Sequence, residues 1–118
     1  MRNVARYVKK LINPHDPSKM WGRQFDLNRK ECVALEGFHL FVHPDDYIGA
    51  SIVANHIYEP HVTTVIRKKL HPGDVFLDIG ANIGSYSVCL MDICENIIAF
   101  EPHPYTAKRC KMNFLLNG

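Results

Sequence analysis

The chain contains 118 residues, of which 47% are hydrophobic, and its formal net charge is +2. This length allows one domain at most, and the hydrophobic share is enough to form a core. The charge is too small to indicate nucleic acid or an anionic membrane as the main partner, and no segment approaches the roughly 20 consecutive apolar residues of a membrane span.

The chain carries few structural signals before residue 32. Apolar side chains at helical spacing over residues 4–11 end at Asn13-Pro14, because proline disfavours a helical residue before it. Two short apolar runs, at residues 32–35 and 38–42, are joined at Gly37, which predicts a hairpin of two strands.

Two helices are predicted after the hairpin. Residues 48–54 form the first, and a clearer helix begins at Glu59-Pro60, since proline suits the first helical position. The apolar stripe predicted for the second helix consists of Val62, Val65, Ile66 and Leu70.

From residue 75 onward, strands and helices alternate. The apolar run at residues 75–79 predicts a buried strand, residues 84–91 a helix, residues 96–100 a second strand and residues 104–116 a final helix. Two strands separated by a helix imply a parallel pair with a right-handed crossover. The fold class is therefore α/β. It contains fewer parallel strands than a doubly wound nucleotide-binding domain, so we expect a truncated fold, a fragment of a longer protein or a chain that needs a partner.

The final predicted helix has one apolar and one basic face. Ala107, Cys110 and Phe114 are predicted to point inward, and Asn117-Gly118 is typical of a helix C-cap. The basic residues Lys108, Arg109 and Lys111 are predicted to form one solvated face.

The cysteines and histidines indicate no special chemistry. The four cysteines show neither close-paired metal spacing nor a dense disulfide pattern, which predicts reduced thiols in a cytoplasmic protein. The seven histidines have no acidic partners at ligand spacing, so we expect no metal site. Residues 1–12 lack the apolar core of a signal peptide.

The strongest functional signal is a glycine-containing turn after the strand at residues 75–79. Gly80 lets the backbone turn sharply off the strand, and Gly84 is expected to let the following helix approach the strand closely. The N–H groups of this turn are expected to point at a ligand above the strand ends. Glu101 ends the next strand, 21 positions after Gly80, where a carboxylate can accept hydrogen bonds from a ribose.

Two residues argue against a dinucleotide as the ligand. Asn82 occupies the position where the dinucleotide-binding pattern has its middle glycine, which touches the pyrophosphate. Asp78 places a carboxylate at the mouth of the turn, where it repels a pyrophosphate and attracts a cation. S-adenosylmethionine has a ribose, an ammonium group and a sulfonium, and no phosphate, so it fits these charges better.

These residues carry a family resemblance. Residues 78–84, DIGANIG, resemble motif I of the class I S-adenosylmethionine-dependent methyltransferases, and Phe100-Glu101-Pro102 resembles their motif II. The longer stretches PGDVFLDIGANIGSYS and AFEPHP are similar to the FkbM family, as are the upstream segments Val42-His43-Pro44 and Tyr58-Glu59-Pro60. The resemblance covers residues 38–118 and implies a Rossmann-like fold. It divides the chain into an N-terminal lead-in, residues 1–37, and a partial domain with the cofactor-binding half, residues 38–118.

The resemblance also implies roles for individual residues. Asp78 would contact the methionine end of the cofactor, and Glu101 would hold the ribose hydroxyls. Pro102 would shape the adenine edge, and Glu59 would face the cofactor or brace the turn. The turn itself would be lined by Gly80, Ala81, Asn82 and Gly84. The implied reaction is methyl transfer to a hydroxyl of a sugar or small natural product, with little activity for this chain alone; neither the base nor the oligomeric state follows.

Each of these residues also has a purely structural interpretation. Gly80 and Gly84 can be ordinary turn residues, Glu101 a solvated loop carboxylate, and Glu59 a charge that suits the start of a helix. Two other functions stay open: a fragment of an NAD-dependent oxidoreductase, and a truncated or degenerate binding module without activity.

Overall fold

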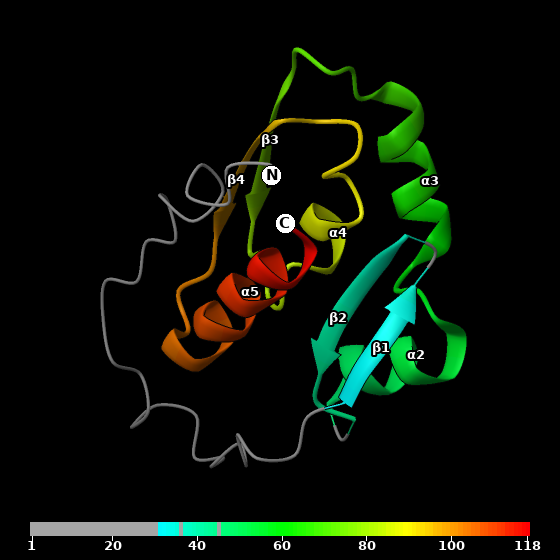
Figure 1. Cartoon of the computed structure of the whole chain (residues 1–118), viewed down its shortest axis with the longest axis vertical. Coiled ribbons are helices and arrows are strands. Elements are labelled where there is room, and N and C mark those ends of the chain that lie inside the picture. Colours follow the sequence, from blue (N-terminus) through cyan, green and yellow to red (C-terminus); the bar gives the residue numbers. More distant parts are fainter. Residues whose placement is uncertain (1–30, 36, 45) are drawn as a thin grey trace.

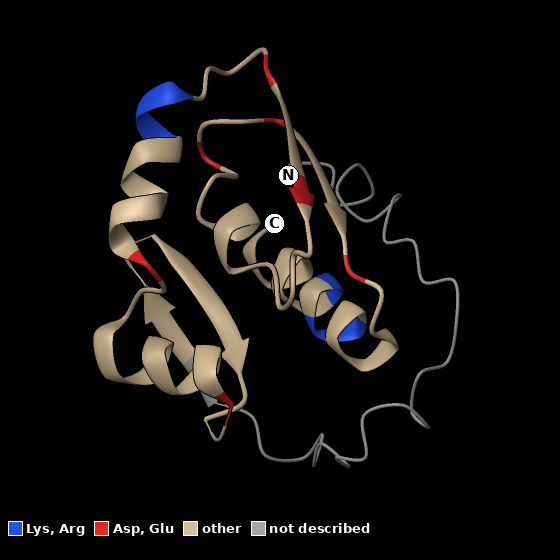
Figure 2. Ribbon diagram, turned by 180° about the vertical axis from the view of Figure 1, so that it is seen from behind, with Lys and Arg blue, Asp and Glu red and all other residues tan. Residues whose placement is uncertain are grey.

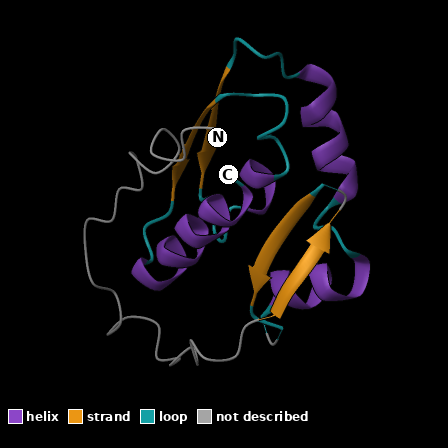
Figure 3. Cartoon of the chain, in the orientation of Figure 1, coloured by secondary structure: helices purple, strands orange, loops and turns teal. Residues whose placement is uncertain are grey.

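The structure, a computed structural model, describes residues 31–35, 37–44 and 46–118. Within these residues the chain is a small α/β domain of two two-stranded sheets and four helices (Figures 1 and 3). The helical pattern predicted for residues 4–11 lies outside the described residues. The chain order of elements is a hairpin, two helices, and then alternating strands and helices.

The predicted hairpin is confirmed. Strands β1 (Glu31–Leu35) and β2 (Phe38–Val42) pair antiparallel, and Gly37 takes the left-handed conformation, with φ +81°, that their turn requires. The division predicted after residue 37 falls at this turn. Leu40 and Val42 of β2 are fully buried and belong to the core.

Helix α2 (Tyr47–Asn55) confirms the first predicted helix and packs against β2. Asp46 caps it, because its side chain accepts a hydrogen bond from the N–H of Gly49. Gly49 has no room for a side chain: an added Cβ would meet the carbonyl oxygen of His43 at 1.9 Å. The capping turn therefore fits tightly against the end of β2.

Helix α3 (Pro60–Lys69) begins at the predicted proline and ends in basic residues, which suit the negative end of a helix (Figure 2). Its buried face overlaps the predicted stripe, because Ile66 and Leu70 pack against the core. Val65 is the exception, since it is exposed while Thr63 is buried.

Strands β3 (Val75–Ile79) and β4 (Asn96–Phe100) pair parallel, as predicted. The prediction that β3 is buried is wrong. Its central carboxylate, Asp78, is buried, but Val75, Leu77 and Ile79 are exposed. Successive side chains of a strand point to opposite faces of the sheet, so one face of β3 packs inward while its apolar face is open.

Helix α4 (Ser85–Val88) is one turn long, so the helix predicted over residues 84–91 is wrong beyond Val88. The chain continues in tight turns, with bonds from the N–H of Leu90 to Ser87 and from that of Met91 to Val88. Two interactions explain why α4 ends at Val88. Arg67 of α3 donates a hydrogen bond to the carbonyl of Cys89, and the irregular path of the chain buries Leu90, Met91 and Cys94 together.

Helix α5 (Pro104–Asn117) confirms the last predicted helix, and Gly118 caps it. Ala107, Cys110 and Phe114 are buried as predicted. Arg109 corrects the prediction of a solvated basic face, because this residue is 6% exposed and pairs with Asp46. The helix also packs against β2, and so joins the hairpin to the β3–β4 unit (Figure 1).

Candidate functional site

The turn after β3 has the backbone that its glycines predict. Gly80 has φ +82° and Gly84 φ +81°, a region that residues with a Cβ rarely adopt. Asn82 lies between them in the same left-handed region, with φ +52°. Asparagine tolerates this conformation better than most residues, so the sequence suits a tight, irregular turn.

The N–H groups of this turn are not directed at a ligand, which corrects the expectation from the sequence. Gly80 and Ala81 both donate to the carbonyl of Phe100, at 2.9 Å each. Asn82 donates to the side chain of Glu101, and Gly84 donates to the carbonyl of Ala81. Four of the five residues at 80–84 thus use their N–H groups to hold the protein together.

Glu101 is the side chain that joins the turn to β4. One carboxylate oxygen accepts the N–H of Asn82 at 3.0 Å, and the other accepts the N–H of His103 at 2.8 Å. The residue is buried. Each carboxylate oxygen can accept a further hydrogen bond, so the group keeps capacity for a ligand while its position is fixed.

Asp78 is the second buried carboxyl at the strand ends. Its Oδ2 atom accepts a hydrogen bond from the hydroxyl of Ser87, on α4. Burial raises the pKa of Asp78 most strongly, and the nearby charge of Glu101 raises it further, against the lowering effect of the Ser87 bond. A cation bound near Asp78 would favour its charged form and so lower its pKa.

Gly84 serves a packing role other than the one predicted. A Cβ at this position would lie 2.9 Å from the sulfur of Cys110 on α5. The missing side chain therefore admits helix α5, rather than bringing α4 against the strand. At Gly80 an added Cβ would meet no atom within 4 Å, so its backbone is open on that side.

Glu59 and Pro102 lie at the margins of the site. Glu59 precedes α3 in the left-handed conformation, and its carboxylate accepts a hydrogen bond from the hydroxyl of Tyr86 on α4. This contact joins the start of α3 to α4, and Glu59 makes no side-chain cap to its own helix. Pro102 is exposed beyond Glu101.

An aromatic pair lies beside the acidic groups. The rings of Tyr58 and Tyr86 are 5.9 Å apart and tilted by 52°. Burial and the bond to Glu59 raise the pKa of Tyr86 well above its usual range, and the charge of Asp78 adds to this effect. Tyr86 therefore keeps its proton at neutral pH and donates it in the hydrogen bond to Glu59.

The three cysteines whose side chains the structure describes are free thiols. Cys94 and Cys110 are buried, and burial raises the pKa of Cys110 to about 12 and that of Cys89 to about 11. Thiols with such values stay protonated at neutral pH and react slowly. Among the residues that the structure describes, no three His, Cys, Asp or Glu side chains gather in a way that could hold a metal ion.

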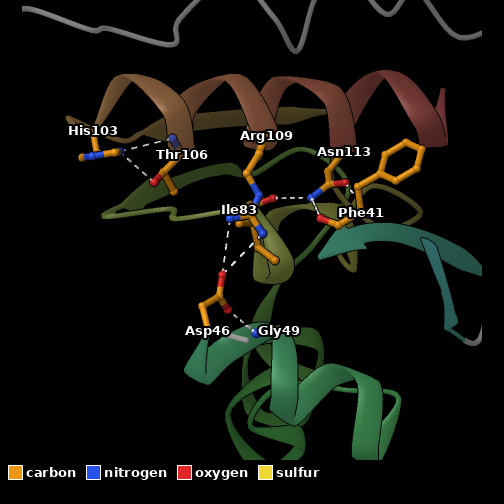
Figure 4. Close-up of polar contacts among 8 residues, drawn as sticks. All are labelled: Phe41, Asp46, Gly49, Ile83, His103, Thr106, Arg109 and Asn113. Carbon is orange, nitrogen blue, oxygen red and sulfur yellow. Dashed lines mark hydrogen bonds and ion pairs between the residues drawn. The ribbon is translucent and has the colours of Figure 1, made fainter. Parts of the chain in front are cut away.

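Sequence reasoning missed several polar residues that build this region. Ser87 follows Asp78 by nine positions and has no motif of its own; only the helical spacing after the turn could have placed it near the strand end. Asn113 is fully buried in α5 and donates to the carbonyl of Ile83, within the turn (Figure 4). A polar residue among the inward positions Cys110 and Phe114 was the available signal.

A small pocket adjoins the turn at Asn82. It has a volume of about 290 Å³ and is lined by Asp46, Tyr47, Ile48, Tyr58, Asn82, Thr106 and Arg109. A larger pocket of about 730 Å³ lies between α3, the hairpin turn and the segment after α4, with Arg67 and Asp92 among its lining residues. Only the smaller one includes a residue of the glycine turn.

Comparison with known proteins assigns no family: no protein-family model, curated protein or solved structure matches this chain. Within the described part of the chain, no helix has both the length and the apolar character needed to cross a bilayer. The chemistry of the site therefore rests on its own residues: a turn that offers few donors to an anion, beside two buried carboxyls.

Proposed function

We propose that this chain binds S-adenosylmethionine at the turn between β3 and α4 and belongs to a methyltransferase with a Rossmann-like fold. The proposal rests on one observation: two carboxyl groups, those of Asp78 and Glu101, lie at the carboxyl ends of the strands, beside a turn whose N–H groups bond within the protein. The parallel β3–β4 pair, with the turn and Glu101 at its carboxyl ends, is the arrangement in which such sheets bind ligands.

The electrostatics separate the candidate ligands. A pyrophosphate needs several free N–H donors, and here the groups of Gly80, Ala81, Asn82 and Gly84 already have acceptors. It would also lie near Asp78 and Glu101, whose negative charges repel it. A cationic ligand without phosphate gains from both carboxyls, which favours S-adenosylmethionine over NAD.

Glu101 and Asp78 would hold the cofactor in this proposal. Glu101 keeps acceptor capacity for the two ribose hydroxyls, while its bonds to Asn82 and His103 fix its orientation. Asp78 would attract the ammonium of the methionine end. When bound, the cofactor supplies an activated methyl group, and the acceptor we propose is a hydroxyl of a sugar or a small natural product.

Calorimetry with S-adenosylhomocysteine tests the ribose role of Glu101. We expect Glu101→Ala to weaken binding by roughly 10- to 100-fold, because hydrogen bonds to a charged group are lost. Glu95→Ala is the matched control, since this exposed glutamate lies directly before the first residue of β4, at the end of the strand away from the site. Circular dichroism checks that Glu101→Ala stays folded, and Glu101→Gln provides a second variant that retains one oxygen acceptor.

Unchanged affinity in Glu101→Ala and Glu101→Gln would contradict the ribose assignment. A thermal-shift comparison separates the classes of function: greater stabilisation by NAD than by S-adenosylhomocysteine would favour the oxidoreductase. Binding of S-adenosylmethionine without methyl transfer in any full-length parent protein would favour a binding module.

A further inference from the structure

We propose that the pocket beside Asn82 binds a neutral, hydroxyl-bearing ring, such as a single sugar unit. The pocket is formed by the start of α2, the segment before α3, the glycine turn and the first half of α5. Its volume of about 290 Å³ lies just below the range of roughly 300–1,000 Å³ for small-molecule sites, so it suits one ring rather than a longer chain.

The pocket lies next to the candidate cofactor site. Asn82 belongs both to the glycine turn, which follows β3, and to the lining of the pocket. Thr106 lies in the first turn of α5, which follows β4. Both strands thus place a residue in the pocket shortly after their carboxyl ends, so its occupant would lie beside a ligand held by Glu101.

An ion pair between Arg109 and Asp46 lines one side of the pocket. Both terminal nitrogens of Arg109 contact Oδ2 of Asp46, at 3.3 and 3.4 Å, and Oδ1 of Asp46 accepts the N–H of Gly49 (Figure 4). Arg109 is 6% exposed, so this charge is held inside the domain. The guanidinium carries five N–H donors, more than Asp46 alone uses, and the surplus can meet hydroxyl oxygens.

The ion pair selects against charged ligands. Arg109 and Asp46 carry opposite charges of equal size, so the polar wall is balanced. An anion would compete with Asp46 for the guanidinium, and a cation would compete with Arg109 for the carboxylate. Separating this partly buried pair costs more than adding hydrogen bonds to it, so a neutral ligand with hydroxyl groups fits best.

Aromatic and hydroxyl side chains complete the recognition surface. Tyr47 is 83% exposed and lines the pocket with Tyr58 and Ile48, which gives flat, apolar surfaces for the face of a ring. The side-chain amide of Asn82 and the hydroxyl of Thr106 add donors and acceptors at the edge. Binding at this pocket stands on these contacts, whereas the role of the ring as methyl acceptor rests on the proposed function.

Titration of the isotope-labelled full chain with methyl α-D-glucopyranoside, followed by amide chemical shifts, tests the proposal. We expect saturable shifts at residues 46–48, 82 and 106–109. Tyr47→Ala should weaken this binding about three- to tenfold, because a stacking surface is lost, while Tyr47→Phe keeps the ring and the affinity. Tyr105→Ala is a control on α5, since Tyr105 contacts His103 and Lys108 outside the pocket.

The charged analogues methyl α-D-glucuronide and glucosamine test whether the Arg109–Asp46 ion pair disfavours charged ligands. Tighter binding of either than of the neutral glucoside would overturn the proposal, as would equal affinity in Tyr47→Ala and the wild type, or the absence of saturable shifts. S-adenosylhomocysteine is titrated separately into the same samples. If it fails to bind while the glucoside binds, the proposed function fails and the pocket assignment stands; the reverse result refutes the pocket alone.

Discussion

The carboxyl group of Asp78 couples protonation to folding. The group is buried and accepts a hydrogen bond from the hydroxyl of Ser87, and burial raises its pKa above the ordinary value of 3.8. The folded protein therefore binds this proton more tightly than the unfolded chain does. Its contribution to stability is greatest below pH 3.8 and is lost as the pH rises through the raised pKa, because the folded state must then ionise a buried group.

Asp78→Asn removes this titration and keeps an oxygen that can accept the Ser87 hydroxyl. As the pH rises from below 3.8 to neutral, we expect the free energy of unfolding of the variant to increase relative to that of the wild type. Urea unfolding at a series of pH values measures this difference. Ser87→Ala should extend the sensitive range upward, since the Ser87 bond lowers the pKa of Asp78. A difference that is constant with pH would contradict the raised pKa.

Gly84 combines two constraints that a pair of variants can separate. An alanine there would be strained by φ +81° and would place its Cβ 2.9 Å from the sulfur of Cys110. Gly37 has the same φ of +81° and no atom within 4 Å of an added Cβ. The two glycines therefore share the backbone cost and differ in the steric cost.

We expect Gly37→Ala to lower the free energy of unfolding by about 1–2 kcal/mol, the cost of the left-handed backbone. Gly84→Ala should cost about 1–3 kcal/mol more, because it overpacks the contact with α5. Chemical denaturation measures both. Cys110→Ala combined with Gly84→Ala should recover part of the added loss; equal losses for the two single variants would show that Cys110 moves aside freely.

At the scale of elements, α5 completes the free edge of β2 with side-chain amides. Asn113 accepts the N–H of Phe41 at 2.7 Å and donates to its carbonyl, and Asn117 bonds both backbone groups of His39 in the same way. The β1–β2 register leaves these groups on the edge away from β1. The two asparagines therefore substitute for a third strand and cover an edge that would otherwise be open.

Removing these amides should loosen the hairpin from α5. We expect Asn113→Ala to cost about 1–3 kcal/mol of stability, because the part-buried N–H of Phe41 and the buried carbonyl of Ile83 lose their partner. Asn117→Ala should cost less, since its bonds are exposed. Denaturation measures the loss, and hydrogen exchange at the amides of His39 and Phe41 locates it. Lys111→Ala, on the exposed side of α5, is the control; similar losses for all three variants would contradict the edge role.

Local periodicity predicted which helices and strands exist, but not every contact between them. The hairpin, α2, α3, α5 and the parallel pair follow from proline, glycine and apolar spacing, which act within a few residues. The short α4 depends on Arg67, 22 positions from Cys89, and the burial of Arg109 depends on Asp46, 63 positions away. No pattern within one element contains these distant partners.

In the candidate site, too, the features set by local residue type were predicted, and those set by distant partners were not. The left-handed backbone at Gly80 and Gly84 follows from residue type, and Glu101 lies beside the turn as its position after β4 predicts. The direction of the turn's N–H groups was predicted wrongly, because their acceptors, Phe100 and Glu101, come from the neighbouring strand. Ser87, Tyr86 and Asn113 had no motif to mark them.

At the scale of the whole molecule, the β3–β4 sheet has one packed face and one open face. The parallel register pairs Leu77 with Ile98 and Ile79 with Phe100, so these side chains share a face. On that face Leu77 is 53% exposed and Ile79 is 81% exposed. Parallel sheets usually bury both faces, so the continuous apolar sequence of β3 predicted burial that the described residues do not supply.

The open face should bind an apolar dye in the folded state. We expect the full chain to enhance the fluorescence of anilinonaphthalene sulfonate under native conditions, and the double variant Leu77→Thr, Ile79→Thr to reduce that signal. Threonine is β-branched, which suits a strand, and both side chains are already exposed, so stability should change by less than about 0.5 kcal/mol per site.

Leu90→Thr separates this surface from loosening of the core. Leu90 is fully buried, so its replacement should cost about 2–4 kcal/mol and raise dye fluorescence as packing loosens. The two changes therefore move the signal in opposite directions if the dye binds the open face. Fluorescence that stays the same in the Leu77, Ile79 double variant would place the dye elsewhere.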